Sequence, residues 1–96
     1  MTYIMANKYN NVLYVGVTGN IYERTKQHKF KLIDGFTKRY NCIKLVHVEV
    51  FDNPSAAIRR EKQLKNWHRE WKMNLIRENN PNFEDLSEKM FEFDER

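Results

Sequence analysis

Two periodicities divide this chain into strands and helices. Alternating apolar residues and short runs of β-branched and aromatic residues predict three strands, over residues 2–6, 12–17 and 42–51. Apolar residues that recur at spacings of three and four predict two helices, over residues 20–33 and 54–67. This order of elements predicts a small mixed domain with one sheet flanked by helices.

The third predicted strand is apolar on both of its faces. Val46, Val48 and Val50 fall on one face, and Leu45 and Phe51 fall on the other. A strand without a polar face is typical of the middle of a covered sheet. We therefore predict that this strand is the central one.

The second helix has a clear start signal, because Asn53 can cap it and Pro54 suits its first position. Residues 66–70 are expected to break or bend the helix. A further helical segment is predicted over residues 71–77, with Trp71 and Leu75 turned towards the core and Ile76 as a further candidate for it.

The first helix carries an apolar stripe that contains a histidine, with Arg24 at its edge. The stripe is formed by Ile21, Thr25, His28 and Leu32. Taken alone, such a histidine is most often a core residue with a satisfied hydrogen bond. An arginine at the edge of a stripe most often reaches out to water.

Glu61 is the main irregularity in the pattern of the second helix. It falls between Ile58 and Leu64 on the apolar stripe, although the other side of the helix was open to it. A carboxylate on a core face is costly unless it is paired or binds a metal. The residues leave two alternatives, a buried ion pair with Arg24 or a neighbouring lysine, and a metal ligand or catalytic carboxylate.

Two tyrosines lie on the first two strands. If the turn between the strands is tight, Tyr3 is opposite Tyr14, and the two rings share a face of the sheet. Taken alone, this arrangement is best explained as a stabilising cross-strand aromatic pair.

The charge of the chain is uneven. Residues 1–78 carry a net charge of +8, whereas residues 79–96 carry −4. A basic body favours a polyanionic partner such as nucleic acid, although a lysine-rich solvated surface is the alternative. Cys42 is the one cysteine, which excludes an internal disulfide and a multi-cysteine zinc site. No segment resembles a membrane span or a secretory signal, and we expect a cytoplasmic monomer.

Several basic residues are candidates for contacts with nucleic acid. Lys38 and Arg39 are interleaved with aromatic residues in the segment FTKRYN, and Lys26 and Lys65 lie on the polar sides of the two helices. The alternative for FTKRYN is a loop packed by Phe36 and Tyr40.

Five of these residues together resemble the GIY-YIG endonuclease superfamily. Tyr14 begins the triplet Tyr-Val-Gly and follows Tyr3 by eleven residues, and the rest of the pattern is Arg24, His28 and Glu61. The segments LYVGVTGNIYERTKQH, FTKRYN and AIRREKQLKNWHREWK are similar to those of small stand-alone bacterial members. The similarity extends over about residues 2–86.

The resemblance implies a three-stranded antiparallel sheet flanked by helices, an α+β fold. It also implies metal-assisted hydrolysis of phosphodiester bonds in nucleic acid, with DNA favoured over RNA. Glu61 would bind one divalent cation, Mg²⁺ or alternatively Mn²⁺, and Arg24 would hold the scissile phosphate. Tyr3, Tyr14 and His28 would position or activate the nucleophile. One carboxylate suits Mg²⁺, which keeps several of its waters.

The sequence departs from the family pattern at three places. The first triplet is Met-Thr-Tyr rather than Gly-Ile-Tyr, and Val17 stands where the excision-repair members have a lysine. Asn80 and Asn82 flank Pro81, but neither aligns securely with the terminal asparagine of many members.

Three functions remain open at this point. The first is an active nuclease of DNA repair or processing, formed by residues 1–86 and followed by an acidic tail, residues 87–96. The second is a catalytically weak nucleic-acid-binding module that assists a repair or processing enzyme. The third is a protein-interaction domain whose acidic tail contacts a basic partner.

Overall fold

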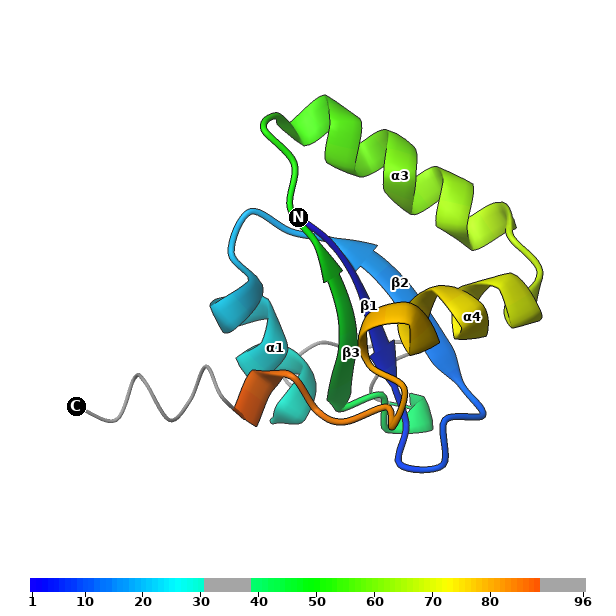
Figure 1. The fold of residues 1–96 in the computed structure, drawn as a ribbon. Coiled ribbons are helices and arrows are strands. Elements are labelled where there is room, and N and C mark those ends of the chain that lie inside the picture. The colour runs from blue at the N-terminus through cyan, green and yellow to red at the C-terminus, as the bar shows by residue number, and fades with distance from the viewer. Residues whose placement is uncertain (31–38, 89–96) are drawn as a thin grey trace.

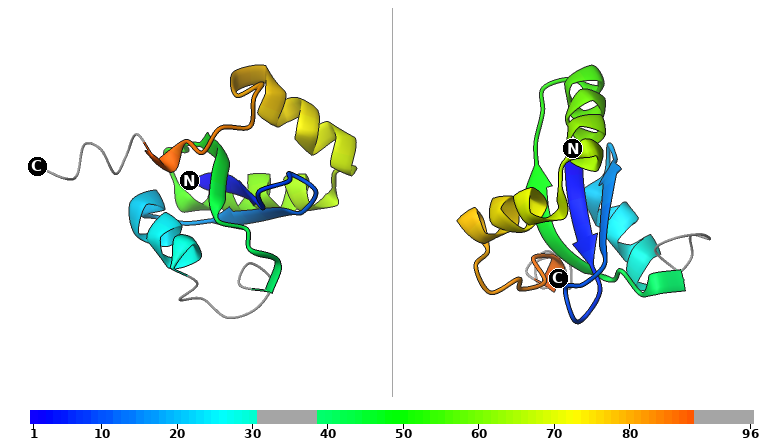
Figure 2. Two further views of the ribbon diagram at one scale, coloured as in Figure 1. Left: turned by 90° about the horizontal axis from the view of Figure 1, so that it is seen from below. Right: turned by 90° about the vertical axis from the view of Figure 1, so that its right-hand side faces the viewer.

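Three antiparallel strands form one open sheet, with helices on both of its faces (Figures 1 and 2). The computed structural model describes residues 1–30 and 39–88. The strands, in the order β2-β1-β3 across the sheet, are β1 (Thr2–Ala6), β2 (Leu13–Val17) and β3 (Lys44–Glu49). The helices are α1 (Ile21–Lys29), α3 (Pro54–Asn66) and α4 (Arg69–Asn79). The predicted α+β fold class is confirmed.

The central strand is β1 and not β3, so that prediction was wrong. Every residue of β1 is buried, and β1 pairs with both other strands. β3 carries apolar residues on both faces because both faces of the sheet are packed, Val46 towards α3 and α4 and Leu45 towards α1. Its outer edge is covered as well. The backbone N–H of Leu86 donates to the Leu45 carbonyl at 2.8 Å, and the Leu45 N–H donates to the Asp85 carboxylate at 3.2 Å. The C-terminal segment thus shields β3 almost as a fourth strand would.

A bulge in β3 overturns the predicted alternation of its valines. Ile4 is paired with His47 and Met5 with Leu45, so Val46 is an extra residue in the ladder. Val46 packs with Ile4 towards α3 and α4, whereas Val48 packs against the cluster on the α1 side. Val50 lies beyond the strand and is 75% exposed. The three valines therefore do not share a face.

The turn between β1 and β2 is longer than the tight turn that we assumed. Tyr3 is opposite Gly16, and Met5 is opposite Tyr14, so the register differs by two residues from the predicted one. The Asn7 side chain accepts hydrogen bonds from the N–H groups of Asn11 and Val12, at 3.0 and 3.1 Å, and fixes this wider turn. Because side chains alternate with a period of two, a shift of two residues leaves both tyrosines on the same face.

Side-chain caps start two of the helices at the expected places. The Asn20 side chain accepts from the Glu23 N–H at 3.1 Å and starts α1, and the Asn53 side chain accepts from the Ala56 N–H at 2.9 Å and starts α3. The predicted end of the first helix, near residue 33, lies outside the described residues.

The helix α4 buries two of its three predicted inward residues, Leu75 and Ile76, but not Trp71. Ile76 is the residue of α4 that is fully buried, and Leu75 is partly buried. Trp71 precedes Ile76 by five residues, which is about 140° around a helix, so the two cannot face the same core. Trp71 is 54% exposed, and its predicted inward orientation was wrong.

The packed part of the chain reaches past α4. Asn80, Phe83 and Ser87 are buried, and the Ser87 hydroxyl donates to the Asp85 carboxylate at 2.6 Å. Ser87 is the first residue of the predicted acidic tail, of which residues 89–96 lie outside the described residues. Among the helices of the described part, none is both long and apolar enough to cross a membrane.

Candidate active site on the α1 side of the sheet

Three aromatic side chains from three elements meet on the face of the sheet that α1 covers. Tyr3 comes from β1, Tyr14 from β2 and His28 from α1. The ring centroids are 6.3 Å apart for the two tyrosines, 5.7 Å for Tyr3 and His28, and 5.5 Å for Tyr14 and His28. We call these three residues the aromatic triad. The structure thus brings together three of the five predicted catalytic residues in direct contact.

The members of the triad differ in their access to solvent. Tyr3 is fully buried and His28 is 3% exposed, whereas Tyr14 is only partly buried. The Tyr3 hydroxyl and the His28 Nε2 atom form a hydrogen bond of 3.1 Å. Tyr14 is therefore the triad member that a molecule in solution can reach, and the other two lie behind it.

Burial sets the protonation states of the two inner members. Desolvation raises the pKa of Tyr3 above its ordinary value; the charges of Tyr14 and Glu61 add to this effect and that of Arg24 opposes it. Desolvation, together with the nearby Arg24 charge, lowers the pKa of His28 to about 4. At neutral pH both groups are uncharged, so a neutral imidazole can accept the hydrogen bond that the Tyr3 hydroxyl donates.

The low pKa of His28 predicts that the protein loses stability in mild acid. The unfolded chain binds a proton at His28 below about pH 6.5, but the folded chain does so only below about pH 4. The free energy of unfolding should therefore fall as the pH drops from about 6.5 to 4, by up to about 3 kcal/mol. Urea unfolding at pH 7 and pH 4.5 measures this difference.

His28→Gln is the matched variant for the pH experiment, because it removes the titrating group. Its loss of stability between pH 7 and pH 4.5 should be clearly smaller than that of the wild type. Glu49 and Asp85 have lowered pKa values, so the stability that they contribute begins to be lost near the bottom of this window. That loss is common to both proteins and cancels in the comparison. An equal loss in both proteins would contradict the assignment to His28.

Gly16 is a residue of this site to which the sequence analysis gave no role. It lies opposite Tyr3 in the sheet, and a Cβ atom at Gly16 would lie 2.4 Å from the Tyr3 hydroxyl oxygen. The Tyr3 ring therefore occupies the space where any other residue would place its side chain. Gly16 is the glycine of the Tyr-Val-Gly triplet, so the sequence did contain a hint of its role. The role can be recognised only once the register shows that Gly16 lies opposite Tyr3.

Gly16→Ala is expected to destabilise the protein by roughly 1–3 kcal/mol, because the buried Tyr3 ring would have to move. The midpoint of urea unfolding measures this. The Tyr3–His28 hydrogen bond should also be lost or lengthened. Gly19→Ala is the matched control, since nothing lies within 4 Å of a Cβ atom there, and it should change stability little. Equal midpoints for the two variants would contradict this role of Gly16.

Glu61 approaches the triad from the other side of the sheet, on α3. Its side chain is 15% exposed, and one carboxylate oxygen lies 3.1 Å from the Lys65 ammonium nitrogen. The ion pair with a neighbouring lysine, one of the two alternatives of the sequence analysis, is therefore present. Glu61 is also near enough to Tyr3 for its charge to raise the Tyr3 pKa. A metal site is not excluded by the ion pair, because the lysine side chain is 53% exposed and can swing away.

The donor set at Glu61 restricts the kind of cation it could hold. Among the described residues, no group of three or more His, Cys, Asp or Glu side chains is close enough to bind a metal. A single carboxylate with tyrosine hydroxyls nearby offers only oxygen ligands. This set fits a hard cation such as Mg²⁺, which retains waters, and does not fit a structural zinc site.

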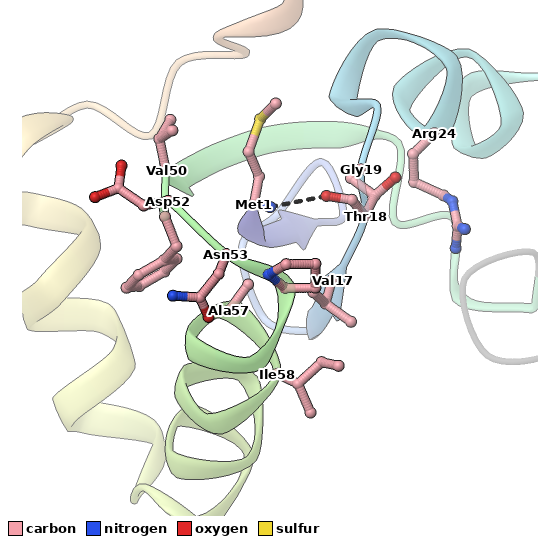
Figure 3. A pocket seen from close by; sticks show the side chains of 12 residues that line it. Met1, Val17, Thr18, Gly19, Arg24, Val50, Asp52, Asn53, Ala57 and Ile58 are labelled. Carbon is pink, nitrogen blue, oxygen red and sulfur yellow. Dashed lines mark hydrogen bonds between the residues drawn. The ribbon is translucent and has the colours of Figure 1, made fainter.

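Arg24 is one of the residues that line an open cavity of about 470 Å³ (Figure 3). Its charge lowers the pKa values of both Tyr3 and His28, so it is close to them. It also lines the cavity, together with residues that precede α1 and α3, among them Thr18, Gly19 and Asn53. Two helix N-termini and a guanidinium group border the same space and favour an anion there, whereas the Asp52 carboxylate, which also lines it, opposes this effect.

The predicted nucleic-acid contacts are not gathered at one place. Lys65 adjoins the site through Glu61, while Lys26 lies on α1, where it pairs weakly with Glu23 at 4.0 Å. Arg39 is exposed, and its guanidinium carbon is 5.5 Å from the Tyr40 ring centroid. Lys38 lies outside the described residues.

The Asn80 side chain has a structural role. Its side-chain nitrogen donates to the carbonyls of Val46 and Glu84, at 3.2 and 2.8 Å, and its oxygen accepts from the Glu84 N–H at 3.0 Å. Asn82 is exposed. Asn80 therefore fastens the end of α4 to β3 and does not line the cavity beside Arg24.

Comparison with known proteins agrees with this geometry. Residues 1–74 match the GIY-YIG catalytic domain. A UPF0213 protein of Syntrophus aciditrophicus is 38% identical over 71 residues, which cover 73% of this chain and 82% of that protein. UPF0213 proteins of Haloquadratum walsbyi and Staphylococcus haemolyticus are each 36% identical, over 69% and 72% of this chain and 74% and 84% of their own lengths. No solved structure gives a significant match.

Proposed function

Because the chain belongs to the GIY-YIG catalytic domain family, we propose that it is a metal-dependent endonuclease that hydrolyses phosphodiester bonds in DNA. The observation that carries the proposal is the aromatic triad, with Arg24 and Glu61 close enough to act on it electrostatically. Five residues that are far apart in the sequence would have no reason to converge in this way for packing alone.

Each residue can be given a role that follows from its position. Tyr14 is the reachable hydroxyl and would orient the attacking water, while Tyr3 and His28 hold its ring and are themselves uncharged. Arg24, at the cavity, would bind the non-bridging oxygens of the scissile phosphate. Glu61 would hold one divalent cation, which supplies positive charge at the phosphate and at the leaving oxygen.

The basic body of the protein supports nucleic acid as the substrate. We propose a role in DNA repair or processing in the cytoplasm, carried out by a monomer. We also propose that residues 1–86 form the nuclease domain, since the chain remains packed after the end of the matched segment at residue 74. The segment that follows, residues 87–96, would be an acidic tail.

The test is cleavage of supercoiled plasmid and branched DNA by the purified protein, with RNA compared in parallel. Cleavage should require Mg²⁺ or Mn²⁺ and should stop on addition of EDTA. Tyr14→Phe, which removes only the hydroxyl of the partly buried tyrosine, should cleave about 10- to 100-fold more slowly. Its unfolding midpoint, measured in parallel, checks that the variant is folded under the assay conditions. Equal nicking by both proteins would mean that a contaminant cuts the DNA, and the proposal would fail.

The second candidate is a nucleic-acid-binding module without useful catalysis. It is favoured by one observation, that Glu61 already has a lysine partner. Such a module would bind DNA in a salt-dependent manner with no need for a metal. The wild-type protein would then cleave DNA no faster than the Tyr14→Phe variant.

A further inference from the structure

A second aromatic and basic surface lies where α3 joins α4, away from the triad (Figures 1 and 2). It is formed by Trp67, His68, Arg69, Trp71 and Lys72, which we call the tryptophan corner. The Trp71 ring contacts Trp67 and His68 edge to face, with centroid distances of 6.0 and 5.0 Å and interplanar angles of 85° and 86°. The proposed chemistry makes no use of any of these residues.

The exposure of Trp71 is what needs an explanation. Its side chain is 54% exposed, although tryptophan has the largest apolar surface of any residue and the helical pattern predicted it in the core. Neither of the two neighbouring rings stacks parallel on it, since both contacts are edge to face. The ring is therefore held in place but keeps surface on which a planar group can stack.

The corner is rigid because its inner ring is anchored. The Arg60 guanidinium carbon is 5.0 Å from the centroid of the Trp67 ring. Arg60 is in turn held by the Glu49 carboxylate, through two hydrogen bonds of 2.8 and 3.1 Å. A ring that is fixed in advance loses little conformational entropy when it binds a ligand, which favours affinity.

The charges around the corner fit a phosphate backbone. Arg69 is exposed and donates to the Asn10 carbonyl at 2.8 Å, which holds its charge between the start of α4 and the β1–β2 turn. Burial and the neighbouring Arg69 charge lower the pKa of Lys72, so these two cations are close together. Residues 65–72 carry three basic residues and one acid, Glu70, and are therefore net positive.

The corner also lies within reach of the proposed active site. Trp67, the C-cap residue of α3, follows Glu61 by six residues, which is about 9 Å along the helix axis. At about 3.4 Å per nucleotide of one strand, this distance corresponds to about three nucleotides. Lys65 lies between the two positions and pairs with Glu61.

We propose that the tryptophan corner binds an unpaired nucleotide strand, with a base stacked on Trp71 and the adjoining phosphates on Arg69 and Lys72. An aromatic ring beside basic side chains is the arrangement by which proteins hold single strands without reading their sequence. The inference rests on the proposed function for its class of substrate. It adds that the substrate carries a single-stranded segment a few nucleotides from the bond that is cut.

Both tryptophans of the chain lie in this corner, so intrinsic tryptophan fluorescence reports on it alone. Titration with oligo(dT), in EDTA so that no strand is cut, should quench this fluorescence. Trp71→Ala should weaken binding of a dye-labelled oligo(dT) by about 5- to 150-fold, and Trp71→Phe should retain most of the affinity. Oligo(U) in a parallel titration shows whether the sugar matters to the corner.

The matched control is Phe30→Ala. Phe30 is also an exposed aromatic residue, 66% exposed, but it lies at the end of α1, on the other face of the sheet from α3 and α4. This variant should bind oligo(dT) as the wild type does, and unfolding midpoints of all variants check that they are folded. Equal loss of affinity in Phe30→Ala and Trp71→Ala would overturn the inference, because the effect would then be common to exposed aromatic residues.

Two further outcomes would also overturn it. One is the absence of quenching at low salt. The other is self-association that Trp71→Ala abolishes while oligo(dT) does not compete, because the corner would then be a contact between two copies of the chain. Cleavage plays no part in these measurements, so a failed nuclease assay leaves the result standing. If the protein cleaves DNA but oligo(dT) does not quench its tryptophan fluorescence, the inference about the tryptophan corner is wrong and the proposed nuclease function still stands.

Discussion

Glu61→Gln is expected to lower the rate of metal-dependent DNA cleavage by about 10³-fold or more. Among residues 1–30 and 39–88, the Glu61 carboxylate is the one acid whose charge acts on the Tyr3 pKa. Its replacement by an amide removes the proposed ligand for the cation with almost no change in side-chain volume. Loss of several kcal/mol of charge stabilisation in the transition state accounts for a factor of this size. The rate should be measured under single-turnover conditions with saturating Mg²⁺.

The variant allows metal binding to be tested separately from catalysis. Binding of Mn²⁺ to the protein in the absence of DNA should be detectable for the wild type and lost in Glu61→Gln. The fold should persist, because Lys65, the partner that loses its ion pair, is 53% exposed and can be solvated instead. Glu78→Gln, an exposed glutamate on α4, is the control and should cleave at the wild-type rate. A fully active Glu61→Gln protein would rule out this carboxylate as the metal ligand.

The local features of the fold were predictable because each follows from neighbouring residues. The caps at Asn20 and Asn53 and the presence of three strands rest on side chains that act within a few positions along the chain. The errors about β3 involve long-range structure. β3 looked central because the sequence does not show that residues 85–86 would cover its edge, or that a bulge would turn Val46 and Val48 to different faces.

The same distinction applies to the candidate site. Helical periodicity identified Glu61 as a carboxylate on a core-facing stripe, and its low exposure agrees with that. The residues alone could not show that Tyr3 is buried while Tyr14 is reachable, since both lie on the same face of the sheet. That difference depends on α1, which covers Tyr3, and on the empty space at Gly16, into which the Tyr3 ring fits. Gly16 has no functional side chain, so a search of the sequence for reactive groups could not identify it.

Arg24→Ala is expected to reduce the cleavage rate by about 10²- to 10³-fold, because no other guanidinium group borders both the cavity and the triad. That statement applies to the described residues 1–30 and 39–88. Arg24→Lys should recover only part of the rate, since an ammonium group is a point charge and cannot bind a phosphate through two parallel hydrogen bonds. Single-turnover cleavage with each variant, at several salt concentrations, measures the effect.

Lys26→Ala is the control for Arg24→Ala, because it removes a neighbouring positive charge of the same helix that lies away from the triad. It should weaken DNA binding slightly and reduce the number of counterions released on binding by about one, as the slope of log K against log salt concentration shows. The cleavage rate at saturating DNA should not change. If the two variants lose cleavage equally, Arg24 acts only as a general surface charge.

Arg24 also leaves a signature that does not depend on DNA. Its charge is one of the two causes that lower the pKa of His28, so removal of the guanidinium should raise the pKa of His28 from about 4 towards its ordinary value. Burial remains in the variant and keeps the value below 6.5. NMR titration of the His28 ring in Arg24→Ala and Lys26→Ala measures this shift, which only Arg24→Ala should show. An unchanged His28 pKa would mean that the arginine does not face the triad, whatever its effect on cleavage.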